Sequence, residues 1–393
     1  MRVALQGSTY PPNATYRCVM TTVDELLPHR DAWERLAQSA VEPNPFFEPD
    51  ALLAAARYVE GGTLWVVAVW RDAGEERELA GVFPLQFGAL RHGILWPLPS
   101  LYVSHMFSAT CAPLISRSDP EGVWEAFLSD LGNLCRGGAV LKCPRLPRGR
   151  GVSSALENVI ARRGLSHAWL SGYTRPAVES DLSYEAYVAR YSPKRRRNLR
   201  RAEQLLAAQG DVTFHTVRGP GPEAARAYAD FLAIEAAGWK GAAGTALAKS
   251  EGTRGFGEHL FGPQRVADGV EFDVLAVAGR AVAVNVNLVR DGIVYAAKSA
   301  YDESLSQASP GTLLDLHLLR RTLDEKAYAR LDSCAQANHP LAAYWLEEQE
   351  VGAVFLATTA GTPRWYFDMM LLTVRQTRRL REQAKELIER FWQ

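Results

Sequence analysis

Apolar residues in the second half of the chain follow the two-residue period of strands. Residues 272–278, 281–289 and 293–299 form apolar or alternating runs, joined by Gly279-Arg280 and by Arg290-Asp-Gly292. Short connections that contain glycine are typical of antiparallel hairpins. The pattern therefore predicts three consecutive antiparallel strands.

The pattern predicts the same order of elements in both halves: strands, a helix, a strand, a helix and a strand. In the first half these are expected at 64–70, 79–87, 123–134, 139–143, 153–163 and 167–170. In the second half the three strands are followed by elements expected at 311–326, 329–334, 340–348 and 353–358. The expected fold class is α/β (α+β), with each half a mixed, mostly antiparallel sheet flanked by helices. The turn-rich segment 172–180 is the expected boundary, which gives domains at 1–175 and 176–393.

Composition narrows the class of protein. The chain has 44 Lys plus Arg residues and 44 Asp plus Glu residues, so it lacks the basic excess that is usual in dedicated nucleic-acid-binding proteins. The five cysteines are far apart and the eight histidines form no ligand motif, so neither a metal site nor a disulfide framework is expected. No run of 18 apolar residues occurs, so no membrane span is expected. These features favour a soluble cytoplasmic protein, and peripheral contact with a membrane stays open.

One segment combines a strand, a loop of small residues and a helix. Tyr295 begins a stretch that passes through Gln307-Ala-Ser-Pro-Gly311 and Thr312 into an apolar helix. Ser309 is expected to cap that helix, and Gly311 is expected to let a ligand approach the backbone closely. Free N–H groups at a helix start bind phosphate, so Gln307, Ser309, Gly311 and Thr312 are candidate cofactor-binding residues. The alternative is an ordinary strand-to-helix turn.

Two charged residues are candidates for catalysis. Glu235 lies near the end of a helix, four and five residues before Trp239 and Lys240, and a carboxylate in a partly apolar cleft can act as a general base. Lys298 lies within a strand between small residues, and Asp302 or Glu303 could be its partner. Lys298 is a candidate for orienting an acceptor or stabilising an oxyanion. The alternatives are a solvated Glu–Lys pair and an edge-strand lysine.

A strongly basic helix is expected after Ser192. Residues 194–201 hold six cations in eight positions, around an apolar stripe at Leu199, Ala202 and Leu206. Arg195 falls on the stripe side, and the other cations face outward. The helix is either a solvated basic face or a surface for the phosphates of CoA, a nucleotide-linked sugar or tRNA.

These segments carry a resemblance to a known family. The order of elements over residues 292–358 resembles the acyl-CoA-binding part of GNAT N-acyltransferases, although the loop has only one glycine where that family usually has two. Asn338-His-Pro-Leu-Ala-Ala-Tyr344 is similar to the family's late helix, whose tyrosine often protonates the departing CoA thiolate. The resemblance thus implies that Tyr344 is a general acid.

A closer resemblance covers most of the chain. Four segments are similar to the CelD-like proteins of cellulose and exopolysaccharide gene clusters, which are themselves similar to the FemX-type double-GNAT fold. These segments are Pro43-Asn-Pro-Phe-Phe, Ser192-Pro-Lys-Arg-Arg-Arg-Asn-Leu, Glu235-Ala-Ala-Gly-Trp-Lys-Gly, and Tyr301-Asp-Glu with Ser309-Pro-Gly.

The resemblance implies acyl transfer, with acetyl the expected group. The donor would be acetyl-CoA or another acyl-CoA, and the acceptor an amine or hydroxyl of a small molecule or saccharide. Trp239, Lys240, Asp302 and Arg195 are the candidate substrate-binding residues, beside the catalytic candidates Glu235, Lys298 and Tyr344. Two alternatives stay open: a FemX-like aminoacyltransferase that uses aminoacyl-tRNA, and a non-catalytic protein of polysaccharide synthesis.

Overall fold

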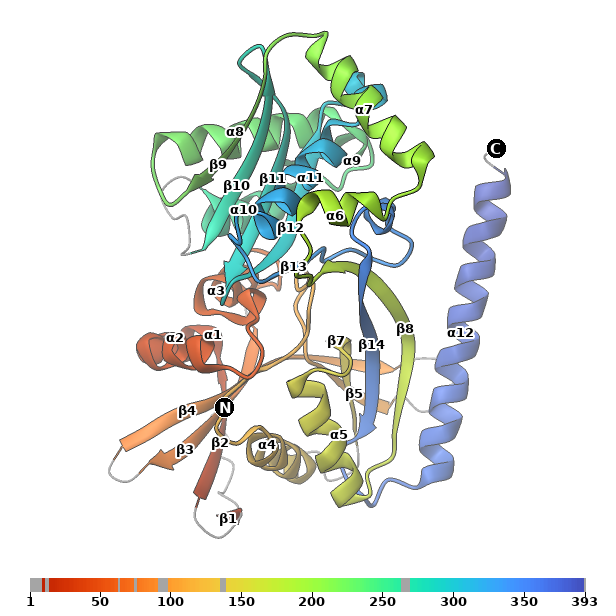
Figure 1. The fold of residues 1–393 in the computed structure, drawn as a ribbon. Helices are drawn as coiled ribbons and strands as arrows, with labels where there is room; N and C mark the ends of the chain where they lie inside the picture. The colour runs from red at the N-terminus through yellow and green to blue at the C-terminus, as the bar shows by residue number, and fades with distance from the viewer. Residues whose placement is uncertain are drawn as a thin grey trace. The chain divides into compact units, whose positions relative to one another are not determined.

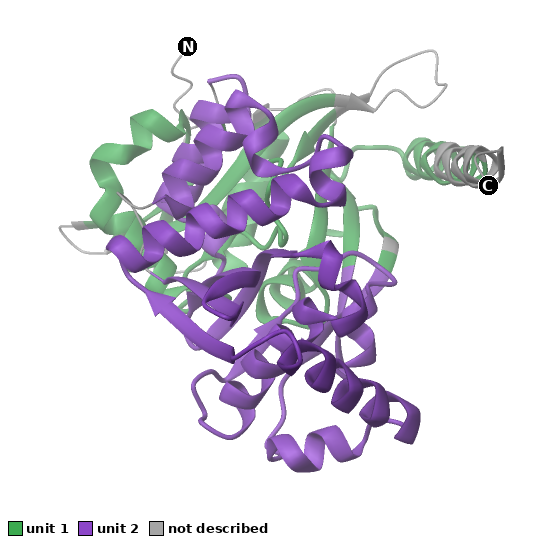
Figure 2. Ribbon diagram, turned by 90° about the horizontal axis from the view of Figure 1, so that it is seen from above, with its two compact units in different colours: residues 1–42, 64–172, 352–393 green, residues 43–63, 173–351 purple. Residues whose placement is uncertain are grey.

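The structure of the chain is a computed structural model. It describes residues 9–10, 14–62, 64–73, 76–90, 98–134, 139–262 and 269–391. The chain divides into two compact units (Figure 2). Unit 1 comprises residues 1–42, 64–172 and 352–393, and unit 2 comprises residues 43–63 and 173–351.

Unit 1 is built around a mixed sheet with helices. Its strands are β1 (Thr9–Tyr10), β2 (Ala14–Thr22), β3 (Trp65–Ala73), β4 (Glu76–Leu90), β5 (Leu98–Tyr102), β6 (Leu114–Ile115) and β7 (Val140–Pro147), with parts of β8 (His167–Val178) and β14 (Glu347–Ala357). Its helices are α1 (Val23–Leu26), η1 (Leu27–His29), α2 (Arg30–Ser39), α4 (Pro120–Leu134), α5 (Gly151–Arg163) and α12 (Arg364–Phe391). The strands pair in the order β1-β2-β3-β4-β5-β7, with β6 on β4.

Unit 2 has the same kind of architecture. Its strands are the remaining parts of β8 and β14 together with β9 (Val212–Arg218), β10 (Val270–Val277), β11 (Arg280–Arg290), β12 (Ile293–Tyr301) and β13 (Arg330–Asp332). Its α-helices are α3 (Pro49–Tyr58), α6 (Tyr184–Ala189), α7 (Pro193–Ala207), α8 (Pro222–Ala237), α9 (Trp239–Ala242), α10 (Glu251–Phe261) and α11 (Pro310–Leu323). Its 3-10 turns are η2 (Pro45–Phe47), η3 (Leu247–Lys249), η4 (Glu303–Ala308) and η5 (Pro340–Ala343).

The sheet of unit 2 confirms the three predicted strands. Strands β9 to β12 pair with their neighbours in antiparallel fashion, and β12 pairs with β13 in parallel. Helices α8 and α11 cover opposite faces (Figure 1). Phe272 contacts Tyr228 of α8, whereas the next residue, Asp273, forms an ion pair with Arg321 of α11. This alternation is what a pleated strand dictates. The predicted mixed, mostly antiparallel sheets flanked by helices are thus confirmed in both units.

Strand β12 has two irregularities. It pairs with β13 only through residues 293–295, so the backbone beyond Tyr295 continues past its parallel neighbour. Its register with β11 passes from Val286↔Lys298 to Asn287↔Ala296, which leaves Ala297 as the extra residue of a β-bulge. The bulge and the open edge lie where β12 approaches α8 and α11.

The boundaries of the units differ from a simple division of the chain. The predicted boundary after residue 175 lies three residues beyond the change of unit at Gly172. Residues 43–63, however, belong to unit 2, because Arg290 of β11 holds Glu48 at 2.6 Å and Tyr58 of α3 packs against Gly255 of α10. Helix α12 belongs to unit 1, since Phe367 and its neighbours pack in a core cluster with residues of β7, β8 and β14.

The helix predicted at 340–348 is wrong. Only the short turn η5 forms, and β14 begins at Glu347. The Tyr344 carbonyl, which a helix would have bonded internally, accepts a hydrogen bond of 2.5 Å from the Tyr191 hydroxyl. That tertiary contact ends the turn at Tyr344.

Candidate functional site

A cleft of about 500 Å³ lies in unit 2, between the end of α8 and the start of α11. We call it the α8–α11 cleft. Its lining includes Glu235, Lys240, Asn285, Gly311, Asp315 and Tyr344. Residues from α8, α9, β11, β12, η4, α11 and η5 therefore meet here. Seven of the eleven predicted site residues line this cleft: Glu235, Trp239, Lys240, Ser309, Gly311, Thr312 and Tyr344.

Glu235 is the buried carboxylate of the cleft. Its neighbours one and two turns earlier on the same helix face, Phe231 and Tyr228, are core residues, so the carboxylate occupies an apolar stripe. The Leu247 amide donates a 2.7 Å hydrogen bond to Glu235 Oε2. Oε1 accepts no hydrogen bond from the described residues and lies 3.5 Å from Lys240 Nζ. One oxygen is thus anchored by an amide, and the other is buried beside the Lys240 ammonium without a hydrogen bond from the described residues.

Lys298 lies on the same face of the sheet as Glu235. Lys298 pairs with Val286, and the next pair is Asn285 with Ser299. Asn285 contacts Asp315 of α11, and since neighbouring pairs point to opposite faces, Lys298 points to the α8 side. Burial lowers the pKa of Lys298, and the Glu235 carboxylate opposes this shift. Lys298 itself is outside the described lining of the cleft, but its charge interacts with the base candidate inside it.

The two acids suggested as partners of Lys298 have other contacts. Asp302 forms a 2.8 Å ion pair with Arg280 and accepts hydrogen bonds from Ser304, and these contacts lower its pKa. Glu303 accepts a 2.7 Å hydrogen bond from the Trp239 amide. Both acids follow β12 directly, Asp302 at the cap of η4 and Glu303 as its first residue. Asp302 is not among the described residues that line the cleft.

The start of α11 opens into the cleft through Ser309, Gly311 and Thr312. Ser309 stands at the cap position as predicted, but its side chain makes no capping hydrogen bond because the residue is left-handed, with φ 45° and ψ 52°. Gln307 is exposed on η4, outside the described lining of the cleft. Gly311 and Thr312, which carry the first N–H groups of this 14-residue helix after Pro310, therefore line the cleft without a side-chain cap.

The backbone at Gly311 is also close to an aromatic ring. A Cβ placed on Gly311 would lie 3.3 Å from Cδ1 of Tyr301. A larger residue would therefore press on Tyr301 before it met any ligand. The neighbouring Thr312, half-buried in the cleft, is a cleaner position for a substitution.

Tyr344 and Arg195 form an aromatic and cationic wall. The Arg195 guanidinium lies 5.6 Å from the ring centroid of Tyr344 and 5.7 Å from that of Tyr191. The two rings meet edge to face at 6.0 Å. Tyr344 lines the cleft, and Arg195 contacts it from behind. Arg195 was predicted to lie on the inward side of α7, and it packs there against the rings of Tyr191 and Tyr344.

Trp239 and Lys240 lie at the mouth of the cleft. Trp239 is 59% exposed although it belongs to a folded helix turn. Lys240 donates a 2.7 Å hydrogen bond to the Ser299 carbonyl and lies 6.0 Å from the Trp239 ring centroid. Lys240 thereby fixes the bulged part of β12 against the end of α8.

Sequence reasoning missed Asp315, which lines the cleft from the second turn of α11. Asn285 donates a 2.9 Å hydrogen bond to its carboxylate. Burial raises the pKa of Asp315 to about 7, and the nearby charge of Asp273 adds to the shift, while Asn285 opposes it. Its only sequence signal is a carboxylate in an apolar stretch, four residues after Gly311.

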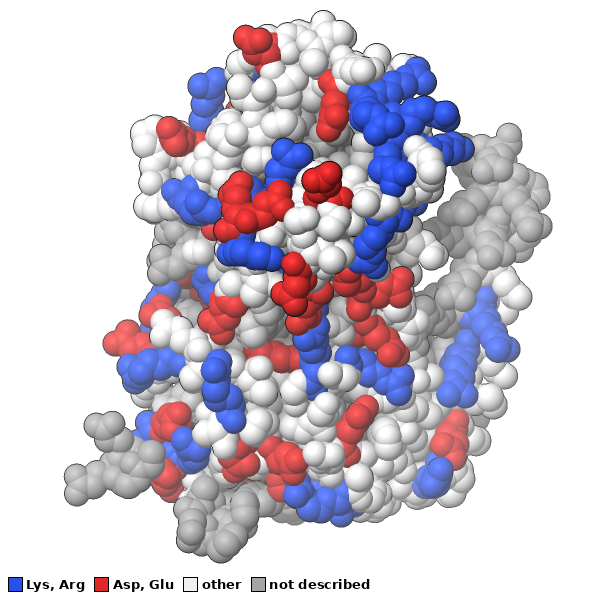
Figure 3. Space-filling model, in the orientation of Figure 1, with Lys and Arg blue, Asp and Glu red and all other residues white. Residues whose placement is uncertain are grey.

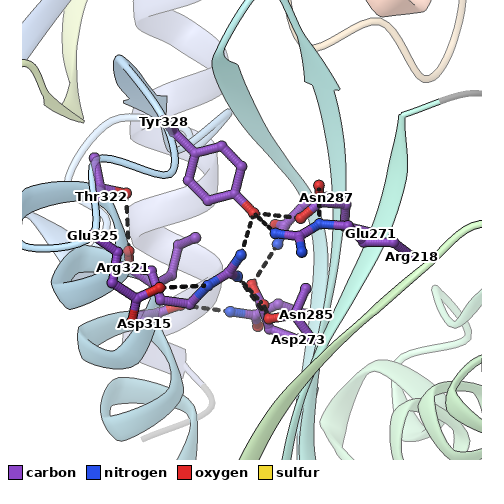
Figure 4. A network of polar contacts seen from close by, with 12 residues as sticks. Arg218, Glu271, Asp273, Asn285, Asn287, Asp315, Arg321, Thr322, Glu325 and Tyr328 are labelled. Carbon is purple, nitrogen blue, oxygen red and sulfur yellow. Dashed lines mark hydrogen bonds and ion pairs between the residues drawn. The ribbon is translucent and has the colours of Figure 1, made fainter.

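A buried polar network holds α11 on the sheet (Figure 4). Arg321 donates hydrogen bonds to Asp273 at 3.0 Å, to Thr216 at 2.6 Å and to the Tyr328 hydroxyl at 2.8 Å. Tyr328 in turn donates to Glu271. Because buried charges are costly without partners, this network fixes the position of α11 and hence of Asp315.

The basic helix predicted after Ser192 is α7, with Ser192 at its cap. Figure 3 shows Lys and Arg side chains gathered over α7. Arg196 is committed to the Ala189 and Tyr191 carbonyls at 2.6 and 3.0 Å. Lys194, Arg197, Arg200 and Arg201 are exposed.

Two observations limit the chemistry of the described residues. No group of three or more His, Cys, Asp or Glu side chains that could hold a metal ion is found among them. Within the same part of the chain, no helix is both long enough and apolar enough to cross a membrane.

Comparison with solved structures shows related folds. The crystal structure of FemX has a TM-score of 0.52 with this chain at 10% identity, covering 86% of this chain and 98% of FemX. A conserved protein of unknown function from Bacteroides thetaiotaomicron VPI-5482 has a TM-score of 0.51 at 10% identity, covering 84% of this chain and 97% of that protein. A comparison with curated protein sequences found no match.

The sequence match concerns the unit that contains the cleft. Residues 193–340 match the family described as the acetyltransferase (GNAT) domain. This range includes α8, the three antiparallel strands and α11. This part of unit 2 is therefore similar in sequence to a GNAT-type acetyltransferase domain.

Proposed function

We propose that the chain transfers an acyl group, acetyl in the first instance, from acyl-CoA to an amine or hydroxyl of a small molecule or saccharide. The observation that carries the proposal is Glu235, a buried carboxylate at the α8–α11 cleft whose Oε2 is anchored by an amide and whose Oε1 accepts no hydrogen bond from the described residues. The same cleft contains the uncapped start of α11. The CelD-like resemblance supports the saccharide as acceptor.

The donor fits the residues on the α11 side. The N–H groups of Gly311 and Thr312 would bind the phosphates of CoA, since a helix start favours negative charge. Beyond Tyr295, the β12 edge that has passed its parallel neighbour offers backbone groups to the rest of the donor. Thr312 and Asp315 lie one turn apart on α11, so the acid lies near the proposed phosphate site.

The catalytic step uses Glu235 as the base. Its Oε1 takes a proton from the acceptor nitrogen or oxygen, whose lone pair then attacks the thioester carbonyl carbon. The carbon–sulfur bond breaks, and the leaving thiolate receives a proton from the Tyr344 hydroxyl. Lys298 stabilises negative charge on the carbonyl oxygen or orients the acceptor. Trp239, Lys240, Asp302 and Arg195 complete the proposed acceptor side.

A second candidate is a FemX-like aminoacyltransferase that uses aminoacyl-tRNA. The exposed cations of α7 favour it, because a concentrated basic face binds RNA phosphates. We prefer acyl-CoA as the donor because the start of α11 lines the cleft, and the N–H groups of a helix start can bind the phosphates of CoA. The proposal also includes a cytoplasmic location, since the five cysteines are few and far apart in the sequence, as is usual in a reducing compartment.

Calorimetric titration of the full chain with acetyl-CoA, longer acyl-CoAs and tRNA separates these functions. The proposal expects saturable acyl-CoA binding that changes little with salt. Binding of tRNA that weakens steeply with salt, with no acyl-CoA binding, would replace it with the aminoacyltransferase. Binding of neither would favour a non-catalytic role in polysaccharide synthesis.

A further inference from the structure

Helix α12 has two apolar faces. Phe367, Met370 and Leu371 are buried in a cluster with residues of β7, β8 and β14. Four large apolar side chains elsewhere on the helix are exposed: Trp365 at 65%, Met369 at 48%, Leu372 at 56% and Leu380 at 65%. At 3.6 residues per turn these four fall within about a quarter of the helix circumference, opposite the buried face. We call them the outer stripe.

The outer stripe is bordered by positive charge. The sequence from 375 to 381 contains Arg375, Arg378, Arg379 and Arg381 and no acidic residue. Among these, Arg375 and Arg379 are exposed and lie beside the stripe on the helical projection. The helix therefore presents apolar side chains, including a tryptophan, next to two exposed arginines, and the exposed Asp368 on the same side pairs with Arg364 at 3.9 Å.

The charge pattern selects between two occupants of the outer stripe. A second copy of α12 that paired through the outer stripe would bring Arg375 and Arg379 close to the same residues of the other copy. This holds for a parallel pair by direct apposition, and for an antiparallel pair because the two arginines lie near the middle of the helix. Like charges at such a contact oppose pairing. An anionic lipid surface instead complements the arginines and accepts the tryptophan at its interface.

We propose that the outer stripe of α12 lies in the interface of an anionic membrane, with the helix parallel to the surface. Trp365, Met369 and Leu372 enter the headgroup boundary, and Arg375 and Arg379 contact lipid phosphates. This attachment is peripheral, in keeping with the absence of a membrane-spanning helix among the described residues. It is independent of the acyl-transfer chemistry in unit 2.

The test is flotation of the full-length protein with vesicles of phosphatidylcholine alone or mixed with phosphatidylglycerol. The wild type is expected to float with the mixed vesicles and much less with the neutral ones. The triple substitution Trp365→Ser, Met369→Ser, Leu372→Ser should lower partitioning about tenfold or more. Arg375→Gln with Arg379→Gln should remove the preference for phosphatidylglycerol and the sensitivity to salt.

Met106→Ser is the matched control, because Met106 is 63% exposed in unit 1 but outside α12, and its vesicle binding should equal that of the wild type. Equal thermal unfolding of all variants shows that the fold is retained. Vesicle binding by the triple variant at the wild-type level overturns the proposal. A second result would also overturn it. If the wild type does not bind the mixed vesicles but forms a dimer, and the triple variant is a monomer, the outer stripe is a contact with a second copy of the chain.

Discussion

Each unit contains a short pair of parallel strands with a helix between them in the sequence. The two units differ in how far the first strand of the pair extends beyond its partner. In unit 1, β5 pairs with β7 through residues 100–102, and in unit 2, β12 pairs with β13 through residues 293–295. In β5 these are the last residues of the strand, whereas in β12 they are the first. Only β12 therefore continues beyond its parallel partner.

The helix starts differ in the same sense. Before α4, the Asp119 carboxylate accepts a 2.9 Å hydrogen bond from the Gly122 amide and another of 2.8 Å from the Tyr16 hydroxyl. Before α11, Ser309 makes no side-chain cap. The start of α4 is thus capped by the Asp119 side chain, whereas the start of α11 lines the cleft. Both units thus have the same arrangement of strands and helix. Unit 2 gains a candidate binding site because the N–H groups at the start of α11 have no side-chain cap, and not because it has additional elements.

The largest expected effect is that of Glu235→Gln. Removal of a general base typically lowers the rate by about two to four orders of magnitude. Turnover with an identified acceptor should fall by that amount, while acyl-CoA affinity measured by calorimetry stays near the wild-type value. Part of the loss should be recovered at higher pH, where the acceptor loses its proton without help. Near-full activity in this variant would reduce Glu235 to a structural residue.

The next effect concerns Asp315, whose raised pKa has a consequence for stability. The folded carboxyl, with a pKa of about 7, binds a proton more tightly than an unfolded aspartate, whose pKa is about 3.9. The free energy of unfolding should therefore fall as pH rises from about 4 to about 7.

The isosteric change Asp315→Asn should remove this dependence while still accepting the hydrogen bond from Asn285. At pH 8 it should raise the free energy of unfolding by up to about 4 kcal/mol relative to the wild type, and at pH 4 by little. Urea unfolding at several pH values measures the difference. A constant difference across this range would contradict the assignment.

The smallest expected effect separates the two helix starts. Thr312→Asp places a carboxylate in the first turn of α11, where it suits the helix dipole but repels phosphate. Acyl-CoA should bind about tenfold more weakly, and the neutral isostere Thr312→Asn should bind it nearly as the wild type does. In unit 1, Asp119→Ala should cost about 1 kcal/mol of stability and leave donor affinity unchanged. Equal affinities for Thr312→Asp and Thr312→Asn would place the donor elsewhere.

Local patterns predicted much of the fold. The strands of unit 2 followed from alternating residues and from hairpin connections at Gly279 and Gly292, both of which have positive φ values. The start of α7 followed from Ser192, which caps it as a serine before a helix is expected to do. Such features depend on neighbours in sequence, so a single chain is enough to show them.

Long-range contacts explain what the sequence did not show. The Tyr191 hydroxyl that shortens the expected helix at 340–348 comes from more than 150 residues earlier, and the contact to Tyr344 leaves no periodic trace. The charge opposite Lys298 belongs to Glu235 rather than to the adjacent acids. Asp315 of α11 was missed because its pKa depends on burial and on Asp273, which lies on strand β10, far away in the sequence.

The path of the chain through the two units has a consequence for the order of folding. A ribosome delivers residues 43–63 long before the strands of unit 2 that they contact, and it delivers α12 after everything that α12 packs against. Unit 1 cannot complete its core until the last helix has emerged, so its early strands wait while unit 2 is synthesised. Expression of residues 1–175 alone or of residues 176–393 alone would leave apolar surface uncovered. Both fragments should therefore be prone to aggregate.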